Sequence, residues 1–408
     1  MATCSLLSVT AQADTGGSPW EIDSAVLLYS ETDNRVSAIE PVVSARKELR
    51  DEEFLQLKVV LDALTGASPN GATPSNQVQT FTRPSGNGSY QTQPGDTPLD
   101  DTFRDTRAAI SVGWEKPLTR LLRRTLGIGV SREFDYTSLS LNGQLSRDLN
   151  NRNTTVMAGA SVAADFIHPV GDIPVAFASM APAGTPQPRD GSVENKNTID
   201  LLFGVTQVLG HDTIGQLNYS FSHASGYLTD PFKVLSVVDG ATGETLDYLY
   251  ERRPDTRTKH SLYGELKHFL GGDVVGVSYR FYSDDWGLVS HTVDLRYRWN
   301  IDTHNYLQPR FRWYTQSNTD FFRYFLVSGE SLPANASADP RLAEYDTTTV
   351  GLKYGHRFSD NSEWNIRAEY YQQKGTDHPA NAIGIQKVLD LFPETTAMIV
   401  QLGYTFRW

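Results

Sequence analysis

The stretch Thr396–Trp408 reads TAMIVQLGYTFRW and alternates between apolar and polar residues up to the final tryptophan. One face of a strand through it carries only apolar or aromatic side chains: Met398, Val400, Leu402, Tyr404, Phe406 and Trp408. The other face is polar apart from Ile399. Alternation with a period of two is typical of a β-strand whose faces meet different environments. Because chain ends usually fray into water, this stretch predicts an apolar environment, either lipid or the core of a soluble sandwich.

Alternating segments of similar length recur along the chain. Examples are 20–31, 122–133, 136–148 and 153–166. A strand that crosses a bilayer at a tilt needs about 9–11 residues, and about sixteen segments of this kind can be placed on the sequence. We therefore predict an all-β fold, a transmembrane antiparallel up-and-down β-barrel of about 16 strands that the last stretch closes. An aromatic final residue is typical of barrels in the outer membrane of Gram-negative bacteria, where the barrel-insertion machinery reads it.

Five long polar segments separate these strands, at about 64–102, 167–197, 226–256, 317–343 and 375–395. If the strand at Trp20 starts in the periplasm, all five lie on the extracellular side. The periplasmic side then receives only short turns, around Arg50, Lys116, Asn151, Gly210, Gly271, Thr303 and Asp360. Long outer loops and short periplasmic turns are the expected asymmetry of outer-membrane barrels.

Tryptophan supports the same orientation. Five tryptophans fall at the periplasmic ends of outward strand faces: Trp20, Trp114, Trp299, Trp364 and Trp408. Indole rings favour the membrane interface, where the ring is in apolar surroundings and its N–H meets water. We predict an aromatic girdle there. The alternative is that aromatic residues cap strand ends, as in any β-protein.

Composition excludes some classes of protein. The 408 residues have a net charge of −12, which argues against nucleic acid as a partner. The sequence contains no run of about 18 apolar residues, so it predicts no transmembrane helix. Mean hydropathy is −0.39, but the alternating strands of a transmembrane barrel are also only weakly apolar in bulk. Cys4 is the one cysteine, so no intrachain disulfide can form.

The first residues resemble an export signal. Ala11-Gln12-Ala13 follows a short apolar stretch and precedes Asp14, which is the pattern of a signal-peptidase site. We expect residues 1–13 to be the remnant of a signal peptide and residues 14–408 to form a single barrel domain. A lipobox at Cys4 is the less favoured interpretation.

Charged residues predicted to face the lumen separate into two walls. The basic wall consists of Arg280, Arg296, Arg298, Arg310, Arg312, Lys353 and Arg367, with Arg357 nearby. The acidic wall consists of Glu21, Asp23, Glu40, Asp62 and Asp165, with Asp200 nearby. Opposed walls set up a transverse field that orients polar solutes, as in porins. The alternative is that these charges pair across the lumen and fill it, for which Glu265/Lys267 and Arg367/Glu369 are suitable neighbours.

One long loop has two possible roles. Asp96, Asp100, Asp101 and Asp105 could supply oxygen ligands to Ca²⁺, although their spacing is not that of an EF-hand. Salt bridges to Arg104 and Arg107 are the favoured interpretation, so we expect neither a cofactor nor a metal site. Because segment 64–102 is long and rich in small residues and prolines, it is also the best candidate to fold into the lumen.

Catalytic motifs of the common enzyme classes do not occur in the sequence. His260, Ser261 and His268 lie close together on one strand, and His168, His223 and His378 lie on predicted outer loops, but none has the spacing of a catalytic or metal site. We expect that the protein is not an enzyme.

Three segments carry a resemblance to a known family: Leu61-Asp-Ala-Leu-Thr-Gly-Ala-Ser-Pro-Asn-Gly-Ala72, Val78-Gln-Thr-Phe-Thr-Arg-Pro-Ser-Gly86 and Pro98-Leu-Asp-Asp-Thr-Phe-Arg-Asp-Thr-Arg107. They resemble a bacterial outer-membrane β-barrel family of unknown function. That family is associated with a small lipoprotein, a thioredoxin-like protein and a flavin transferase that attaches FMN to exported proteins. The resemblance therefore implies a lipoprotein or a flavinylated or redox protein as a partner, besides outer-membrane lipids and lipopolysaccharide.

Two functions compete on this basis. The first is a channel or a transport or export component for small polar solutes, with a bias toward anions because of the basic wall. The second is a loop-plugged scaffold that anchors a lipoprotein or a flavinylated or redox partner at the outer membrane. The first predicts ion conductance, and the second predicts co-purification without conductance.

Overall fold

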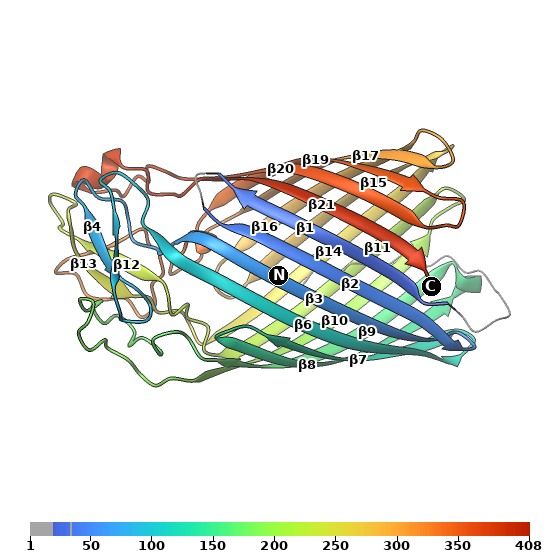
Figure 1. Ribbon diagram of the computed structural model, residues 1–408, viewed down its shortest axis with the longest axis horizontal. Helices are drawn as coiled ribbons and strands as arrows, with labels where there is room; N and C mark the ends of the chain where they lie inside the picture. The colour runs from blue at the N-terminus through green and yellow to red at the C-terminus, as the bar shows by residue number, and fades with distance from the viewer. Residues whose placement is uncertain (1–18, 33–34) are drawn as a thin grey trace.

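The computed structural model describes residues 19–32 and 35–408, so the predicted signal remnant and Cys4 lie outside the described residues. Its main feature is a closed antiparallel barrel of sixteen strands (Figure 1). In barrel order the strands are β1 (Glu21–Glu31), β2 (Ser37–Arg50), β3 (Glu53–Pro69), β6 (Leu99–Thr119), β7 (Leu122–Arg132), β8 (Tyr136–Leu149), β9 (Thr154–Ile167), β10 (Glu194–Val208), β11 (Thr213–Gly226), β14 (Thr256–Leu270), β15 (Asp273–Asp284), β16 (Val289–Asn300), β17 (Asn305–Gln316), β19 (Tyr345–Arg357), β20 (Glu363–Gly375) and β21 (Thr395–Arg407). The predicted fold class and strand number are confirmed.

The last strand closes the barrel against the first. β21 pairs with β1 from Glu21↔Arg407 to Glu31↔Ala397. Just beyond the ladder, Trp20 and Trp408 exchange two backbone hydrogen bonds of 2.7 and 2.8 Å. Closure matters because an open sheet would leave a row of unpaired N–H and C=O groups at each edge.

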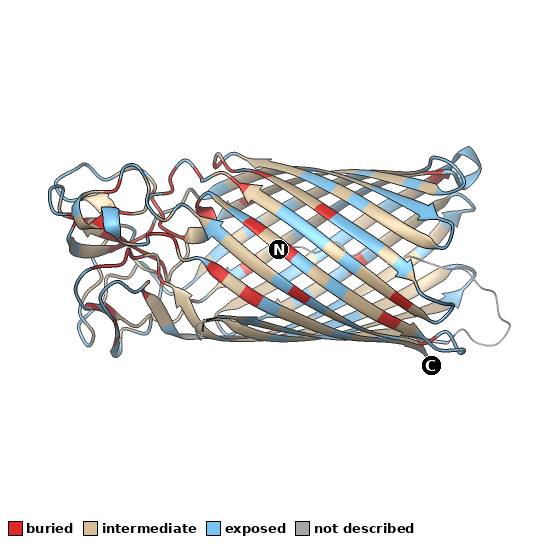
Figure 2. Ribbon diagram, turned by 90° about the horizontal axis from the view of Figure 1, so that it is seen from above, coloured by how far each residue is buried: buried red, intermediate tan, exposed pale blue. Residues whose placement is uncertain are grey.

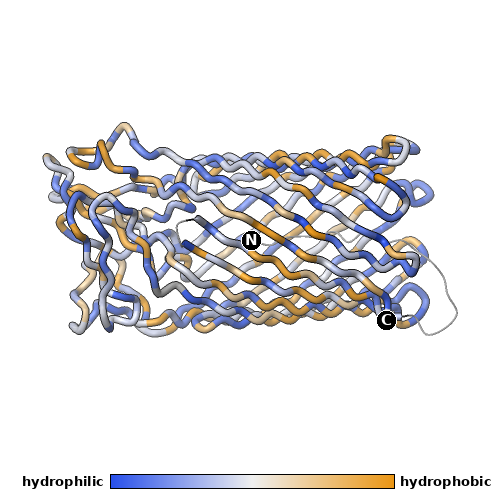
Figure 3. The backbone as a smooth tube through the Cα atoms, turned by 45° about the horizontal axis from the view of Figure 1, so that its top comes forward, coloured by the Kyte–Doolittle hydropathy of each residue, from blue (hydrophilic) through white to orange (hydrophobic). Residues whose placement is uncertain are grey.

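Apolar side chains point outward along the barrel strands and are exposed there, and apolar positions, drawn in orange, recur along the strands in Figure 3. Ile128 on β7 and Leu141 on β8 are directly paired and 57% and 55% exposed. Exposed positions alternate with less exposed ones along each strand (Figure 2). This pattern is the reverse of a soluble protein and is that of a barrel with an apolar band on its outside.

The two ends of the barrel differ. One end, the turn end, carries only short connections between strands, including the one-turn helix η1 (Asn150–Arg152). The turn predicted around Lys116 was wrong, because β6 continues to Thr119, with Lys116 paired to Arg124, before the chain reverses at 120–121. Similarly, β3 continues to Pro69, so the first long loop begins at residue 70 instead of 64.

The other end carries all five long loops, which together form what we call the cap: residues 70–98, 168–193, 227–255, 317–344 and 376–394. In Figure 1 the cap lies beyond the barrel, at the end opposite the C-terminus. It contains its own small elements: the hairpin β4 (Gln79–Thr82) and β5 (Ser89–Thr92), the sheet of β12 (Val234–Val238), β13 (Thr245–Tyr250) and β18 (Leu326–Val327), and the short helices η2 (Pro340–Leu342) and η3 (Gly384–Val388). In the described part of the chain no helix is long and apolar enough to cross a membrane.

The cap has an apolar core to which distant loops contribute. Phe81 is fully buried and packs with Tyr90 of the same loop and with Val234 and Tyr250 of residues 227–255. The first loop leaves the barrel at its third strand and the other at its ninth of sixteen. Loops that start so far apart on the rim can share a core only by extending across the mouth. The expectation that the first loop folds into the lumen is therefore wrong, because its residues build the cap.

Two glycines in residues 61–72 allow the first loop to pack closely as it leaves the barrel. Gly71 has a φ of +96°, and a Cβ there would lie 2.5 Å from the carbonyl oxygen of Val234. Gly66 has a φ of +134°, and a Cβ there would lie 2.3 Å from the carbonyl oxygen of Arg35. Because only glycine adopts these conformations without strain and permits such close approach, both positions fix how the first loop leaves the barrel.

Candidate functional site: the basic wall of the lumen

The strand register places the basic wall inside the barrel. On β16 the side chains of Leu295 and Trp299 are 40% and 50% exposed on the outside. Asp294, Arg296 and Arg298 alternate with them and so face the lumen. The same alternation places the other predicted residues of the wall inside: Arg280 on β15, Arg310 and Arg312 on β17, Lys353 and Arg357 on β19, and Arg367 on β20.

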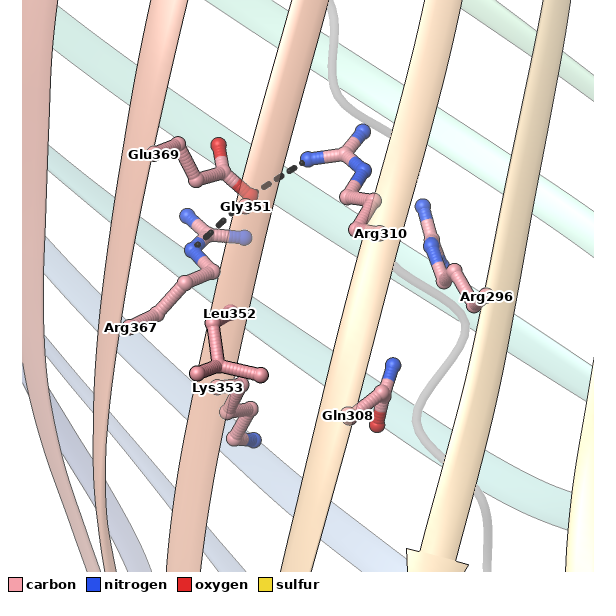
Figure 4. A pocket seen from close by; sticks show the side chains of 8 residues that line it. All are labelled: Arg296, Gln308, Arg310, Gly351, Leu352, Lys353, Arg367 and Glu369. Carbon is pink, nitrogen blue, oxygen red and sulfur yellow. Dashed lines mark hydrogen bonds and ion pairs between the residues drawn. The ribbon is translucent and has the colours of Figure 1, made fainter.

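Some of these charges form a network with two buried carboxylates. Arg310 donates to Asp294 at 2.5 Å and to Glu369 at 3.0 Å. Arg296 pairs with Asp294 at 2.8 Å. Arg367 pairs with Glu369 at 3.5 Å, as Figure 4 shows. Three guanidinium groups thus share two carboxylates, which leaves the network with a net positive charge.

Other members of the wall are not neutralised. Arg280, Arg312 and Lys353 have no ion-pair partner among residues 19–32 and 35–408. Arg298 lies 3.6 Å over the ring of Tyr306 instead of against a carboxylate. The barrel strands from β15 to β20, whose residues are all described, carry eight basic and four acidic side chains that point into the lumen.

A recess of about 220 Å³ lies in this wall. Figure 4 shows the polar side chains that surround it: Arg296, Gln308, Arg310, Lys353, Arg367 and Glu369. Guanidinium groups present several N–H donors in one plane, which matches the oxygens of a carboxylate or a phosphate. The recess has the charge and the donors to attract a small anion.

A glycine on the next strand makes room for the ring of Tyr306, which lies beside the basic wall. Tyr306 is 2% exposed, and its hydroxyl donates to Glu363 at 2.5 Å. Gly355 is its direct partner on β19, and a Cβ there would lie 2.2 Å from the Tyr306 ring. The glycine leaves the space that the ring occupies, and the ring in turn supports Arg298.

On the opposite wall, two carboxylates are neutralised by neighbouring cations and two others accept hydrogen bonds from hydroxyl groups. Arg107 donates to Asp62 at 2.5 Å, and Lys196 lies 3.0 Å from Asp165. Asp23 accepts a hydrogen bond from Thr405 at 2.6 Å, and Asp200 one from Ser161 at 3.0 Å. Glu21 and Glu40 also face inward, on β1 and β2.

Ion pairs between described barrel residues follow the wall and do not cross the lumen. Most join residues on one strand or on neighbours, as in Lys267–Glu265 at 3.5 Å on β14. The longest step, Arg310–Glu369, passes from β17 to β20 with only β19 between them. The described charges therefore line the lumen, and they do not fill it by pairing across it.

The five tryptophans of the predicted girdle lie at the turn end. Trp20 and Trp408 are adjacent there, and Trp408 is 80% exposed. Trp299 and Trp364 are 50% and 36% exposed on the outside. Trp114 shares the face of its partner Leu126, which is 41% exposed, and its indole N–H donates to Glu53 at 2.7 Å.

The aspartates of the suggested Ca²⁺ loop do not converge on one point. Asp100 and Asp101 are consecutive residues of β6 and so point to opposite faces, and Asp101 lies 3.4 Å from Arg83. Asp101 and Asp105 share a face but are about 13 Å apart along the strand. No group of three or more metal-ligating side chains occurs among the residues that the structure describes.

The histidines do not form a site either. His260 points outward to the hydroxyl of Tyr219 at 2.8 Å, whereas its neighbour Ser261 points inward. His268 bonds Thr213 at 2.8 Å, and His223 bonds Thr258 at 3.0 Å. His378 lies 3.6 Å from Asp390 in the cap.

A buried ion cluster in the cap was missed by reasoning from the sequence. Arg253 lies 2.5 Å from Glu251 and 2.8 Å from Asp339, and Arg341 bridges Asp339 and Asp230 at 2.5 and 2.6 Å. Burial alone would raise the pKa of Asp339, but Arg341 and Arg253 outweigh it and hold that pKa well below its ordinary value. Burial raises the pKa of Glu251, whose oxygen also accepts from Ser337. The cluster joins two loops that are far apart in the chain, so no local sequence pattern indicates it.

A family model with the description "Protein of unknown function (DUF3570)" matches residues 1–406. The chain belongs to this family. The resemblance inferred from residues 61–107 is thereby confirmed for the family, and the DUF3570 model itself assigns no activity. No curated protein matches the chain.

Solved structures resemble the DUF3570 chain in fold alone. The ferric enterobactin receptor PfeA of Pseudomonas aeruginosa is 9% identical with a TM-score of 0.45, covering 97% of this chain and 60% of the receptor. OccAB1 of Acinetobacter baumannii is 9% identical with a TM-score of 0.41, covering 96% of each chain. OccK5 (OpdH) of Pseudomonas aeruginosa is 9% identical with a TM-score of 0.41, covering 96% of this chain and 98% of the other. The chain spans 55 to 62% of the length of the PfeA structures that it matches.

Proposed function

We propose that this DUF3570 protein is an outer-membrane transport barrel that conducts small anionic solutes, with the cap on the extracellular side. The observation that carries the proposal is the unneutralised charge of the basic wall. Arg280, Arg312 and Lys353 face the lumen without an ion-pair partner in the described chain.

Such a wall acts on ions that enter the lumen. The Debye length at physiological ionic strength is about 8 Å, so fixed charges at a lumen wall influence ions that pass close to it. Strands of low dielectric behind the charges concentrate the field in the water of the lumen. Anions would be enriched along β15 to β20, and cations would be depleted there.

Ion selectivity in planar bilayers tests this proposal. The variant Arg280→Gln/Arg312→Gln/Lys353→Gln removes three charges and leaves no buried carboxylate without its partner. In a salt gradient, we expect the wild type to prefer anions and the variant to lose most of this preference. Arg147→Gln is the control, because Arg147 is exposed on the outer face of β8. Equal selectivity of all three proteins would refute the role of the basic wall.

A scaffold remains the second candidate, because the cap spans the mouth of the barrel. In that case the partner would be the lipoprotein or the flavinylated or redox protein expected from the family resemblance. Deletion of residues 71–97 removes the first cap loop between β3 and β6. Silence of the wild type with large conductance steps in the deletion would mean a barrel closed by its cap. Silence of both would reject the channel and favour the scaffold, which co-purification from cells would then test.

A further inference from the structure

Four inward tyrosines of the described strands share one arrangement at the cap end of the lumen. Each donates its hydroxyl to the side chain two residues further along its own strand. The pairs are Tyr29 to Glu31 at 2.8 Å, Tyr282 to Asp284 at 2.8 Å, Tyr314 to Gln316 at 2.6 Å and Tyr371 to Gln373 at 2.8 Å. Residues two apart on a strand lie on the same face. The rings therefore lean along the wall toward the cap and present apolar surface to the lumen.

The cap end of the structure fixes the acceptors of these hydrogen bonds. The amide of Gln316 donates to the carbonyl oxygens of Arg341 and Ala343 at 3.0 and 2.6 Å. Asp284 is held by Arg257 at 2.5 Å. Because these two acceptors are held, the orientation of the Tyr314 and Tyr282 rings is set before any solute arrives.

Two of the tyrosines follow an arginine on the same inward face. The segments read Arg280-Phe-Tyr-Ser-Asp284 on β15 and Arg312-Trp-Tyr-Thr-Gln316 on β17. In each, the arginine precedes the tyrosine by two residues. Neither arginine has an ion-pair partner in the described part of the chain, so both guanidinium groups can take an anion.

The register repeats this arrangement as a three-dimensional unit. Arg280 pairs across to Thr292, and Thr292 pairs across to Tyr314. In the same way Arg312 pairs across to Thr349, and Thr349 to Tyr371. Each unit thus contains an arginine, the tyrosine that follows it, a threonine on the next strand and a tyrosine two strands away, about 10 Å from the arginine backbone. Tyr314 belongs to both units.

We propose that the two units bind small anions that carry a planar ring, that is, aromatic carboxylates. The guanidinium group pairs with the carboxylate, and the tyrosine rings pack against the ring of the solute. Thr292, which is only partly buried, offers a hydroxyl between the arginine and the distant tyrosine of the first unit, whereas Thr349 of the second unit is 6% exposed, so there the arginine and the tyrosines make the contacts. This proposal rests on the proposed anion transport and names the class of anion.

Equilibrium binding tests the units independently of conductance. Isothermal titration of the refolded full chain in detergent micelles would compare benzoate with acetate, which share the carboxylate. We expect benzoate to bind about three- to tenfold more tightly, which is the factor that one aromatic pair contributes. Arg280→Gln/Arg312→Gln should abolish binding of both. Equal affinity of the wild type for the two acids, or no binding of either, would overturn the proposal.

Variants of the shared tyrosine show whether the ring or the hydroxyl matters. Tyr314→Leu should remove the preference for benzoate, whereas Tyr314→Phe should keep it because the ring remains. Tyr136→Leu is the matched control, since Tyr136 is an inward tyrosine at the same end of β8 that bonds Lys196 at 2.9 Å. A preference unchanged in Tyr314→Leu, or lost equally in Tyr136→Leu, would contradict the units. Binding without anion-selective conductance would reject the channel and leave the units in place.

Discussion

The cap and the barrel use the same amino acids in opposite ways. In the cap, Phe81 is fully buried among other side chains. In the barrel, Ile128 is 57% exposed on the outer face, although it lies in the middle of a regular strand. Charges follow the same reversal, because Glu251 and Asp339 are buried inside the cap while Arg280 and Arg312 face the lumen.

The reversal shows that one chain is folded for two solvents. The cap buries its apolar side chains as a water-soluble domain does, with an ion cluster satisfied by partners inside it. The barrel closes its backbone hydrogen bonds into a ring and leaves apolar side chains outside, which is stable where the surroundings are hydrocarbon. Stability of the two regions should therefore respond to different changes.

The largest effect is expected from the ion cluster of the cap. Asp339→Ala leaves Arg253 buried without its 2.8 Å partner, which should cost about 3–5 kcal/mol of cap stability. Hydrogen exchange should speed up in residues 227–255 and 317–344 and remain slow in the barrel strands. Glu330→Ala, at an exposed position of the same loop, is the control. Faster exchange throughout the barrel would show that cap and barrel do not unfold separately.

A matched pair of arginine substitutions isolates the effect of the solvent. Ile128 and Leu246 are 57% and 60% exposed, the first on the barrel and the second in the cap. Ile128→Arg should lower the stability of the barrel in lipid by about 2–4 kcal/mol, because it moves a charge into hydrocarbon. Leu246→Arg should change stability by less than about 0.5 kcal/mol. Urea unfolding in lipid vesicles measures both, and equal costs would mean that the outer face of β7 does not meet lipid.

The smallest expected effect is a pH dependence of stability that arises at the rim between the barrel and the cap. Burial, together with the charge of Asp105, raises the pKa of Glu133 from 4.5 to about 7. Its contribution to stability is therefore complete below the ordinary pKa and is lost as pH rises through about 7. Asp339, with its lowered pKa, has the opposite sign and loses its contribution only on strong acidification.

Glu133→Gln should flatten this dependence. The midpoint of urea unfolding should fall from about pH 5 to pH 8 in the wild type and change less in the variant. Glu330→Gln serves as the control at an exposed glutamate of the cap. An identical slope in wild type and Glu133→Gln would show that Glu133 does not titrate in this range.

Local patterns determined most of the barrel. Alternation along β8 and β21 identified both faces, because every second side chain of a strand points the same way. The side of each long loop followed from counting strands, and the inward position of Arg296 or Lys353 followed from alternation alone. Errors occurred at strand ends such as Pro69 and Thr119, where the hydrogen-bonded ladder continues after the apolar pattern stops.

The tertiary structure decided what the polar loops and charges do. The Gly71 contact with Val234, the Arg253–Asp339 pair and the unit of Arg312, Thr349 and Tyr371 all join residues remote in the chain. The alternating strands and the sign of the charge on each wall could be predicted from the sequence, since the face of each side chain depends only on residues two positions apart. Which charges find partners, and where five loops meet, depends on the closed ring of strands, because closure alone brings their ends together.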